Sequence, residues 1–189
     1  MRLAIPLSLV LSLCATACAT APAAEERPGE TLWNAIRPLC GKAYEGRLVE
    51  GTEPSDAAIG EQRLVMWVRD CDDDEIRIPF RVGADASRTW ILSRFAGGVR
   101  LKHDHRHPDG VEDEISRYGG DTTGAADGLS LDFHADAFTA ELLPAAATNV
   151  WTVAVDPGST FTYALRREAE GRRFRVEFDL ARPVELPRP

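Results

Sequence analysis

The sequence has no excess of basic residues and no long hydrophobic run. It contains 22 Lys and Arg against 30 Asp and Glu, which gives a formal net charge of −8. Binding to nucleic acid requires a basic surface, so this balance predicts no nucleic-acid partner. The apolar run over residues 3–13 is shorter than the roughly 20 residues that a transmembrane helix needs.

Two common catalytic signatures are also missing. The glycine-rich segment 119–128 has no lysine, which excludes a phosphate-binding loop of the Walker type. Neither Ser130 nor Ser159 stands in a Gly-x-Ser-x-Gly setting, so a serine hydrolase is not supported. We therefore expect a non-enzymatic protein in preference to an enzyme.

The first 17 residues have the three parts of a bacterial secretory signal peptide. A positive start at Arg2 precedes the apolar run, and small residues follow that run. The next segment is rich in Ala, Pro and Glu and has no periodicity, which is typical of a flexible tether. The predicted organisation is a signal peptide over 1–17, a tether over 18–29 and a single β domain over 30–189.

Residues 15–18, Ala-Thr-Ala-Cys, resemble the lipobox of bacterial lipoproteins. The resemblance implies a thioether lipid on Cys18, and through it a membrane partner. Ala19 follows the cysteine in place of aspartate, which by the same resemblance implies a periplasm-facing outer-membrane lipoprotein. Ala15 departs from the leucine that the family favours. Cleavage after 21–23, Ala-Pro-Ala, is the alternative, and it predicts a soluble periplasmic or secreted protein.

Two of the four cysteines belong to the export signal or its end. Cys14 lies inside the signal and Cys18 at its end, so Cys40 and Cys71 remain on either interpretation of the cleavage site. An even number of cysteines in an oxidising compartment predicts a disulfide between them. Closing the loop is expected to stabilise the fold by about 3–4 kcal/mol.

From residue 42 onward the dominant hydrophobic period is two. Segments 76–82 and 174–180 alternate between apolar and charged or polar residues, which is typical of strands with one buried face. The other predicted strands lie at 43–49, 62–69, 88–95, 99–107, 111–118, 129–134, 149–155 and 160–166, and short helices are predicted at 30–39 and 135–143. About ten short strands with brief connections predict an all-β fold.

We expect these strands to form one antiparallel up-and-down barrel, similar to the lipocalins and other calycins, because closure removes exposed sheet edges. A jelly-roll sandwich is the alternative. The barrel reading also predicts an apolar cavity, lined by residues such as Trp67, Phe80, Trp90 and Val176. Such a cavity would bind a small apolar ligand.

Three of the four histidines lie in one predicted strand. His103, His105 and His107 share a face with Val99 and Leu101, so they continue the core-side stripe. Side chains two residues apart on a strand lie about 7 Å apart, and two such imidazoles can bind one Zn²⁺ or Fe²⁺. Neighbouring backbone and carboxylate groups can equally satisfy these histidines without a metal. Histidine also titrates near neutral pH, so the stripe can respond to pH.

His105-x-His107 followed by Glu112 resembles the first motif of the cupin family. The resemblance implies a Zn or Fe ion held by these three residues, and a cupin-like metal-binding protein is the alternative function. The chain departs from the family pattern in two places. Gly98 is one residue too far from His105, and no histidine follows His134, where the second motif needs one. The candidate ligands are His103, His105, His107 and Glu112.

The chain from 32 to 184 is similar to an uncharacterised group of secreted bacterial proteins and lipoproteins. The segments that carry the similarity are 101–110, 118–120, 147–151 and 173–178. The similarity implies export and a single domain, and it assigns no activity. The sequence thus predicts an exported, lipid-anchored envelope barrel that binds a small ligand.

Overall fold

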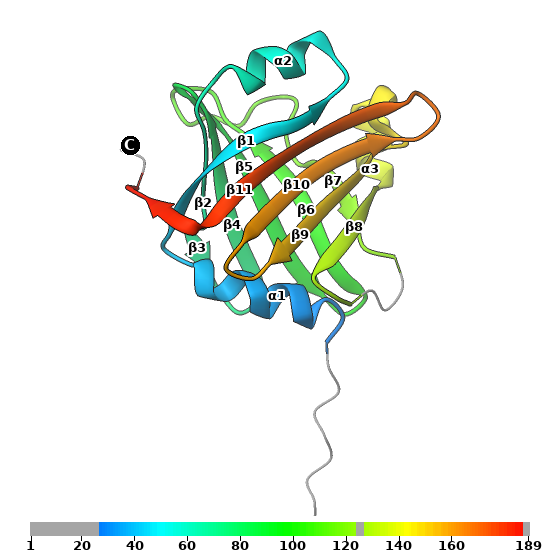
Figure 1. Ribbon diagram of the computed structural model, residues 1–189. Coiled ribbons are helices and arrows are strands. Elements are labelled where there is room, and N and C mark those ends of the chain that lie inside the picture. The colour runs from blue at the N-terminus through cyan, green and yellow to red at the C-terminus, as the bar shows by residue number, and fades with distance from the viewer. Residues whose placement is uncertain (1–26, 124–126, 187–189) are drawn as a thin grey trace, which may run out of the picture.

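The computed structural model of the protein describes residues 27–123 and 127–186 (Figure 1). The predicted signal peptide over 1–17 and the predicted lipid site Cys18 lie outside these residues. The described strands are β1 (Ala43–Gly51), β2 (Leu64–Trp67), β3 (Asp70–Cys71), β4 (Glu75–Val82), β5 (Asp85–Phe95), β6 (Gly98–His105), β7 (Tyr118–Asp121), β8 (Ser130–Ala135), β9 (Val150–Asp156), β10 (Thr160–Arg167) and β11 (Arg172–Val184). The helices are α1 (Glu30–Ile36), α2 (Pro54–Gly60) and α3 (Ala137–Leu142), with single 3-10 turns η1 (Arg37–Leu39) and η2 (Pro144–Ala146).

Ten of the strands form a closed antiparallel barrel. The order runs β2-β1-β11-β10-β9-β8-β7-β6-β5-β4, and β2 pairs back onto β4. An even number of strands allows the ring to close with an antiparallel contact at every seam, which leaves its members without a free edge. The short β3 stands outside the ring and pairs with β4. The predicted up-and-down barrel is confirmed, and the structure is not the alternative jelly-roll sandwich.

The predicted strand over 111–118 is wrong. All other predicted strands overlap an observed one, but residues 106–117 form a loop. One bridge joins Arg106 to Glu112 within that loop, and the backbone N–H groups of Asp113 and Arg117 donate to the carbonyl oxygens of His105 and His103 in β6.

The place of the missing strand in the ring is taken by β7, which overlaps the glycine-rich segment 119–128, where the sequence predicts no strand. A Cβ on Gly120 would lie 1.6 Å from the carbonyl oxygen of His134, so β7 can approach β8 this closely only with glycine at position 120.

Helix α1 closes one end of the barrel, which we call the closed end (Figure 1). Leu32, Trp33 and Ile36 point into the barrel and are at most 1% exposed. Arg94 of β5 lies over the Trp33 ring at 4.5 Å and pairs with Glu30 at 2.6 Å, so the helix is held by charge as well as by apolar burial. Helices α2 and α3 lie at the opposite end, which we call the open end.

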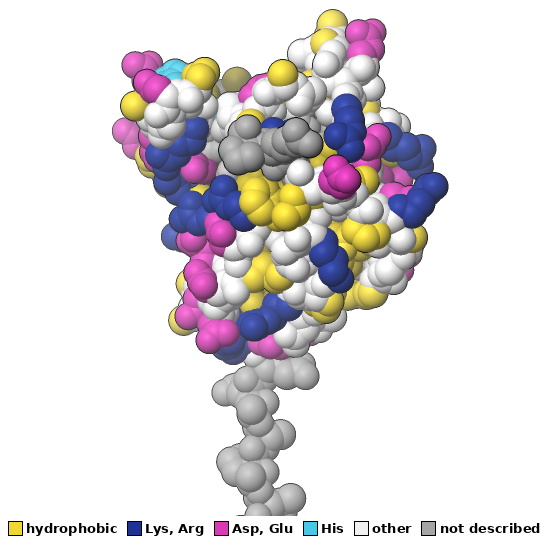
Figure 2. All heavy atoms as spheres, turned by 90° about the vertical axis from the view of Figure 1, so that its left-hand side faces the viewer, with side chains coloured by type: hydrophobic (Ala, Val, Ile, Leu, Met, Phe, Trp, Pro, Cys, Tyr) yellow, Lys and Arg dark blue, Asp and Glu magenta, His cyan; other side chains and the backbone are white. Residues whose placement is uncertain are grey.

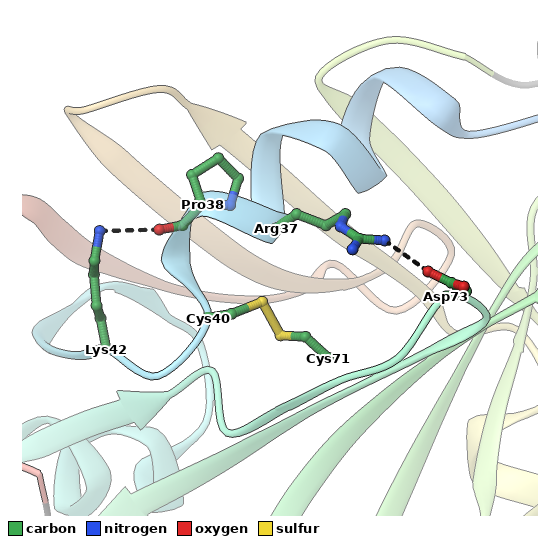
Figure 3. Close-up of a disulfide and its surroundings, with 6 residues drawn as sticks. All are labelled: Arg37, Pro38, Cys40, Lys42, Cys71 and Asp73. Atoms are coloured by element: carbon green, nitrogen blue, oxygen red, sulfur yellow. Dashed lines mark hydrogen bonds and ion pairs between the residues drawn. A yellow bond between two sulfur atoms is a disulfide. The ribbon is translucent and has the colours of Figure 1, made fainter.

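The predicted disulfide between Cys40 and Cys71 is confirmed (Figure 3). It joins the turn after η1 to β3 across a separation of 31 residues. An ion pair between Arg37 and Asp73 at 3.2 Å lies beside it, and Lys42 donates to the carbonyl of Pro38 at 2.9 Å. These contacts attach the α1–η1 segment to the barrel wall at the closed end.

The two faces of the strands differ as the period-two pattern predicts. In β9 and β11 buried residues alternate with half-buried ones, and the apolar side chains point inward. Figure 2 shows the outer surface from one side, where acidic and basic side chains are mixed and apolar areas lie between them. None of the helices in the described residues is long and apolar enough to cross a membrane.

Candidate ligand-binding cavity

A cavity of about 350 Å³ lies inside the open end of the barrel. Ser55 and Ile59 of α2 line it, together with Leu143 and Ala146 of the α3–η2 segment, so these two segments cover the open end. Ser55 is exposed, which places the cavity next to the surface there. Its volume falls at the small end of the range for ligand pockets, about 300–1,000 Å³.

A larger hollow, of about 730 Å³, lies outside the barrel along β1 and β11. Exposed charged side chains such as Glu45, Arg47 and Arg182 line much of it. We regard the smaller hollow as the candidate site because the barrel wall surrounds it and apolar side chains dominate its lining.

Aromatic rings make up much of the cavity wall. Trp90 is at the centre of this group, with its ring centroid 4.8 Å from that of Phe80 and 4.2 Å from that of Tyr163, both in stacked geometry. On the other side, the ring of Trp151 lies 5.2 Å from that of His103. The aromatic residues of the lining are Phe80, Trp90, Tyr118, Trp151, Tyr163 and Phe174, with the imidazoles of His103 and His105.

His103 is buried and has a partner at each ring nitrogen. Its Nδ1 lies 3.1 Å from the carbonyl oxygen of Tyr118, which can only accept, so Nδ1 carries the proton. Its Nε2 then accepts from the hydroxyl of Tyr163 at 2.7 Å. Burial lowers the pKa of His103 to about 3, so the ring is neutral in the folded protein near pH 7.

His105 lies half-buried one step nearer the surface. Its Nε2 is 3.1 Å from the hydroxyl of Tyr118. Burial lowers its pKa, and the positive charge of Arg88 lowers it further. Burial also raises the pKa of Tyr118 to about 12 and that of Tyr163 well above its usual value. Each histidine of the cavity is therefore paired with a neutral tyrosine hydroxyl.

Two arginines line the cavity, and each is paired with a carboxylate. Arg172 donates from Nη2 to Asp56 at 2.8 Å, and the side chains of this pair are 10% and 3% exposed. Arg88 pairs with Asp85 at the start of β5. Both positive charges at the cavity are thus balanced by the protein itself.

Asn149, just before β9, lines the cavity and is 7% exposed. Its backbone groups bond to Ala146 and Ala135. Its side-chain Oδ1 is buried and has no hydrogen-bond partner among the described residues. A buried acceptor without a partner is costly, and native proteins contain few.

The structure separates the residues that the sequence predicts as metal ligands. His103 and His105 line the cavity, but β6 ends at His105, and His107 is exposed with its nearest carboxylate, Asp113, at 4.0 Å. Glu112 lies outside the barrel and bonds to two arginines of the 106–117 loop, at 3.0 and 3.1 Å. In the described part of the chain, no three His, Cys, Asp or Glu side chains are grouped so that they could hold a metal ion.

The predicted cavity lining is partly right. Phe80 and Trp90 line the cavity, whereas Trp67 and Val176 do not. Val176 is fully buried in the packed core, and Trp67 stacks under Arg69 at 5.8 Å. The strand period predicts that Tyr163 points inward, but nothing in the sequence distinguishes Asn149 from any other polar residue before a strand.

Comparison of the chain with protein families, with curated proteins and with solved structures gave no match. The cavity and its residues are therefore the basis for any statement about function. The similarity to a secreted bacterial group stays a prediction.

Proposed function

We propose that the protein is an exported, lipid-anchored β-barrel of the bacterial envelope that binds a small molecule and catalyses no reaction. The observation that carries the binding proposal is the aromatic cavity of about 350 Å³ inside the open end. A barrel stabilised only by its core has no need for an internal hollow, because close packing is the rule in protein interiors. A concave site walled by rings with a few fixed polar groups is typical of ligand pockets.

The proposal of binding without catalysis follows from the protonation and hydrogen bonding of the polar groups that line the cavity. His103 is neutral and bonded at both nitrogens, so it is a poor general base at neutral pH. The hydroxyl groups of Tyr118 and Tyr163 are paired with histidines, and burial keeps both protonated. These groups fix the shape of the wall and supply no activated nucleophile.

Two features support export. The signal-like sequence over 1–17 is one, and the Cys40–Cys71 disulfide is the other, since disulfides persist mainly outside the cytoplasm. The described chain begins at the closed end, beside α1 (Figure 1). A lipid on Cys18 would therefore attach the barrel to the membrane from its closed end.

The binding proposal is tested by titrating the folded protein with small apolar compounds, such as indole and hexan-1-ol, followed by calorimetry. Ala146→Trp places a large ring in the cavity lining and should abolish binding. Ala147 is the next residue and is exposed, so Ala147→Trp should leave binding unchanged. Absence of binding to the unaltered protein, or equal binding by both variants, would contradict the proposal.

The anchoring proposal is tested on the full chain expressed in a Gram-negative host. We expect the mature N-terminus to be Cys18 with a diacylglyceryl modification, seen by mass spectrometry and by partition into the membrane fraction. Cys18→Ser should remove both signals. A mature N-terminus after residue 23, together with protein free in the periplasm, would contradict the anchoring proposal and support the soluble alternative.

A further inference from the structure

We infer that the indole ring of Trp90 closes the cavity across the inside of the barrel and so sets the length of ligand that the protein accepts. This inference rests on the proposed ligand-binding function and names the residue that limits the ligand to a compact molecule. It follows from the layer of side chains at which the cavity ends, from the position of Trp90 across the barrel and from the packing beneath its ring.

The cavity ends at the same layer of side chains on six strands. Inward side chains two residues apart on a strand share a face, and α1 marks the end toward which the deeper ones lie. The last layer that lines the cavity consists of Phe80, Trp90, His103, Trp151, Tyr163 and Phe174. The next inward side chains on the same strands lie outside the lining and are at most 2% exposed, and they are Ile78, Leu92, Leu101, Val153, Phe161 and Val176. The cavity therefore occupies only the part of the barrel near the open end.

Trp90 reaches across the barrel. Its strand β5 stands opposite β10 in the ring, with β6 to β9 between them on one side and β4, β2, β1 and β11 on the other. The ring of Trp90 nevertheless stacks on that of Tyr163 in β10, with the centroids 4.2 Å apart. The Tyr163 hydroxyl is bonded in turn to Nε2 of His103 in β6 at 2.7 Å. These three side chains form a partition across the inside of the barrel, which we call the ring partition.

The far side of Trp90 is packed against the core. Its ring stacks with that of Phe161 at 6.4 Å and meets that of Phe178 edge-on at 6.1 Å. Both phenylalanines are fully buried, and neither lines the cavity. A core relaxes only in part around a deleted side chain, so removal of the indole ring would leave space that joins the cavity. The size of the residue at position 90 thus sets the depth of the cavity.

The space on the open side of the ring partition suits a compact ligand. Its volume of about 350 Å³ corresponds to roughly a dozen water molecules, and so to a ligand of about a dozen non-hydrogen atoms. Each methylene group that a ligand buries raises its affinity about four-fold, whereas one that stays in water adds little. A long chain should therefore gain little over a short one.

The test compares hexan-1-ol with dodecan-1-ol, titrated by calorimetry into the folded, disulfide-bonded protein. In the unaltered protein, dodecan-1-ol should gain far less than the roughly four-fold per methylene that full burial of its six additional groups would give. Trp90→Ala should raise the ratio of dodecan-1-ol to hexan-1-ol affinity at least about ten-fold, as expected when two or more further methylene groups are buried. Trp90→Leu keeps more of the buried volume and hence more of the stability, and should raise the ratio in the same direction.

Phe161→Leu is the matched control. It also removes an aromatic ring from the interior, but on the far side of Trp90, where the indole ring separates any new space from the cavity. The ratio of the two affinities should stay as in the unaltered protein. An equal rise of the ratio in the Phe161 and Trp90 variants would overturn the inference, and so would an unchanged ratio in both Trp90 variants.

The unaltered protein provides a second measurement, which needs no substitution. Intermolecular NMR cross-peaks of bound hexan-1-ol should appear at the rings of Trp90 and Tyr163 and be absent at Phe161 and Phe178. Cross-peaks to Phe161, or a full four-fold gain per methylene for dodecan-1-ol, would overturn the inference and leave the proposed binding function standing. Failure of both alcohols and of indole to bind would contradict the proposed function itself.

Discussion

His103 illustrates how a single residue can have a different role from the one that its sequence context suggests. In the sequence it belongs to a histidine stripe with metal-ligand spacing. In the structure Tyr118 and Tyr163 occupy both of its nitrogens, and its ring stacks on that of Tyr118 at 4.5 Å. In this structure the buried imidazole, with its two neutral partners, forms a polar element of the cavity wall.

The lowered pKa of His103 predicts a pH dependence of stability. Its folded pKa of about 3 lies below the unfolded value of about 6.5, so the unfolded state binds the extra proton. The contribution of His103 is fully present above about pH 6.5 and is lost as the pH falls toward 3, at up to about 1.4 kcal/mol per pH unit. His103→Gln should therefore reduce the slope of unfolding free energy against pH between 6 and 4, measured by denaturant titration.

Nitrogen chemical shifts of the His103 ring provide a direct check on this assignment. They should report the neutral Nδ1–H form from pH 8 down to pH 5. A protonation midpoint near pH 6 would contradict the burial and hydrogen bonding described for the His103 ring.

At the scale of elements, one buried ion pair attaches α2 to the barrel. Asp56 bonds Arg172 and also accepts from the backbone N–H of Glu53 at 2.9 Å, so one carboxylate both begins the helix and fixes it to β11. Because this one carboxylate has both roles, a single substitution of Asp56 affects the start of α2 and its attachment to β11. Because Ser55 and Ile59 line the cavity, the position of α2 also shapes the ligand site.

Asp56→Ala should release α2 and destabilise the protein by about 3 kcal/mol or more, because the guanidinium of Arg172 loses its buried partner. Hydrogen exchange followed by mass spectrometry should show faster exchange over residues 54–60. Ser55→Ala, at an exposed position of the same helix, is the control and should exchange like the unaltered protein. Unchanged exchange in the Asp56 variant would mean that other contacts hold the helix.

The strand β7 depends on two glycines for its close approach to its neighbours. Gly120 faces the His134 carbonyl, and Gly119 has φ of 152° with Leu101 O only 2.0 Å from an added Cβ. The hydroxyl of Thr139 bonds both backbone groups of Gly119 at 2.7 Å, which fixes α3 to this strand. A two-glycine strand has no side-chain period, which explains why the alternation pattern does not reveal it.

Gly120→Ala should disrupt the pairing of β7 with β8 and lower the unfolding free energy by several kcal/mol, as expected when backbone atoms must separate. Thermal or denaturant unfolding measures the change. Gly110→Ala is the control, since its φ of 86° disfavours alanine but nothing lies within 4 Å of the added Cβ. That variant should lose only about 1–2 kcal/mol. Equal losses of unfolding free energy in the two variants would show that the close approach of β7 to β8 does not require glycine at position 120.

At the scale of the whole molecule, the barrel was predictable from the sequence, and the lining of its cavity was predictable only in part. Period-two alternation predicts strands such as 174–180, and cysteine counting predicts the Cys40–Cys71 bond, because both depend on local or compositional rules. The cavity depends on which inward side chains leave space between distant strands. His103 of β6 and Tyr163 of β10 meet there at 2.7 Å from positions 60 residues apart in the sequence, and no local pattern encodes that contact.

The two ends of the barrel also divide its roles. The closed end holds α1, the disulfide and the start of the described chain, whereas the open end holds the cavity and its two covering segments. This separation allows the anchoring and binding proposals to be tested independently. Changes at the closed end should alter stability without altering ligand preference.

The central claim is that a small molecule binds inside the open end of the barrel. The most direct measurement is a series of ¹H–¹⁵N NMR spectra of the isotope-labelled protein during titration with indole. The account predicts saturable shifts in the amide or ring N–H signals of Trp90, Asn149 and Trp151, with Trp33 at the closed end unaffected. Absence of saturable shifts at these residues, or shifts confined to the outer surface, would contradict it.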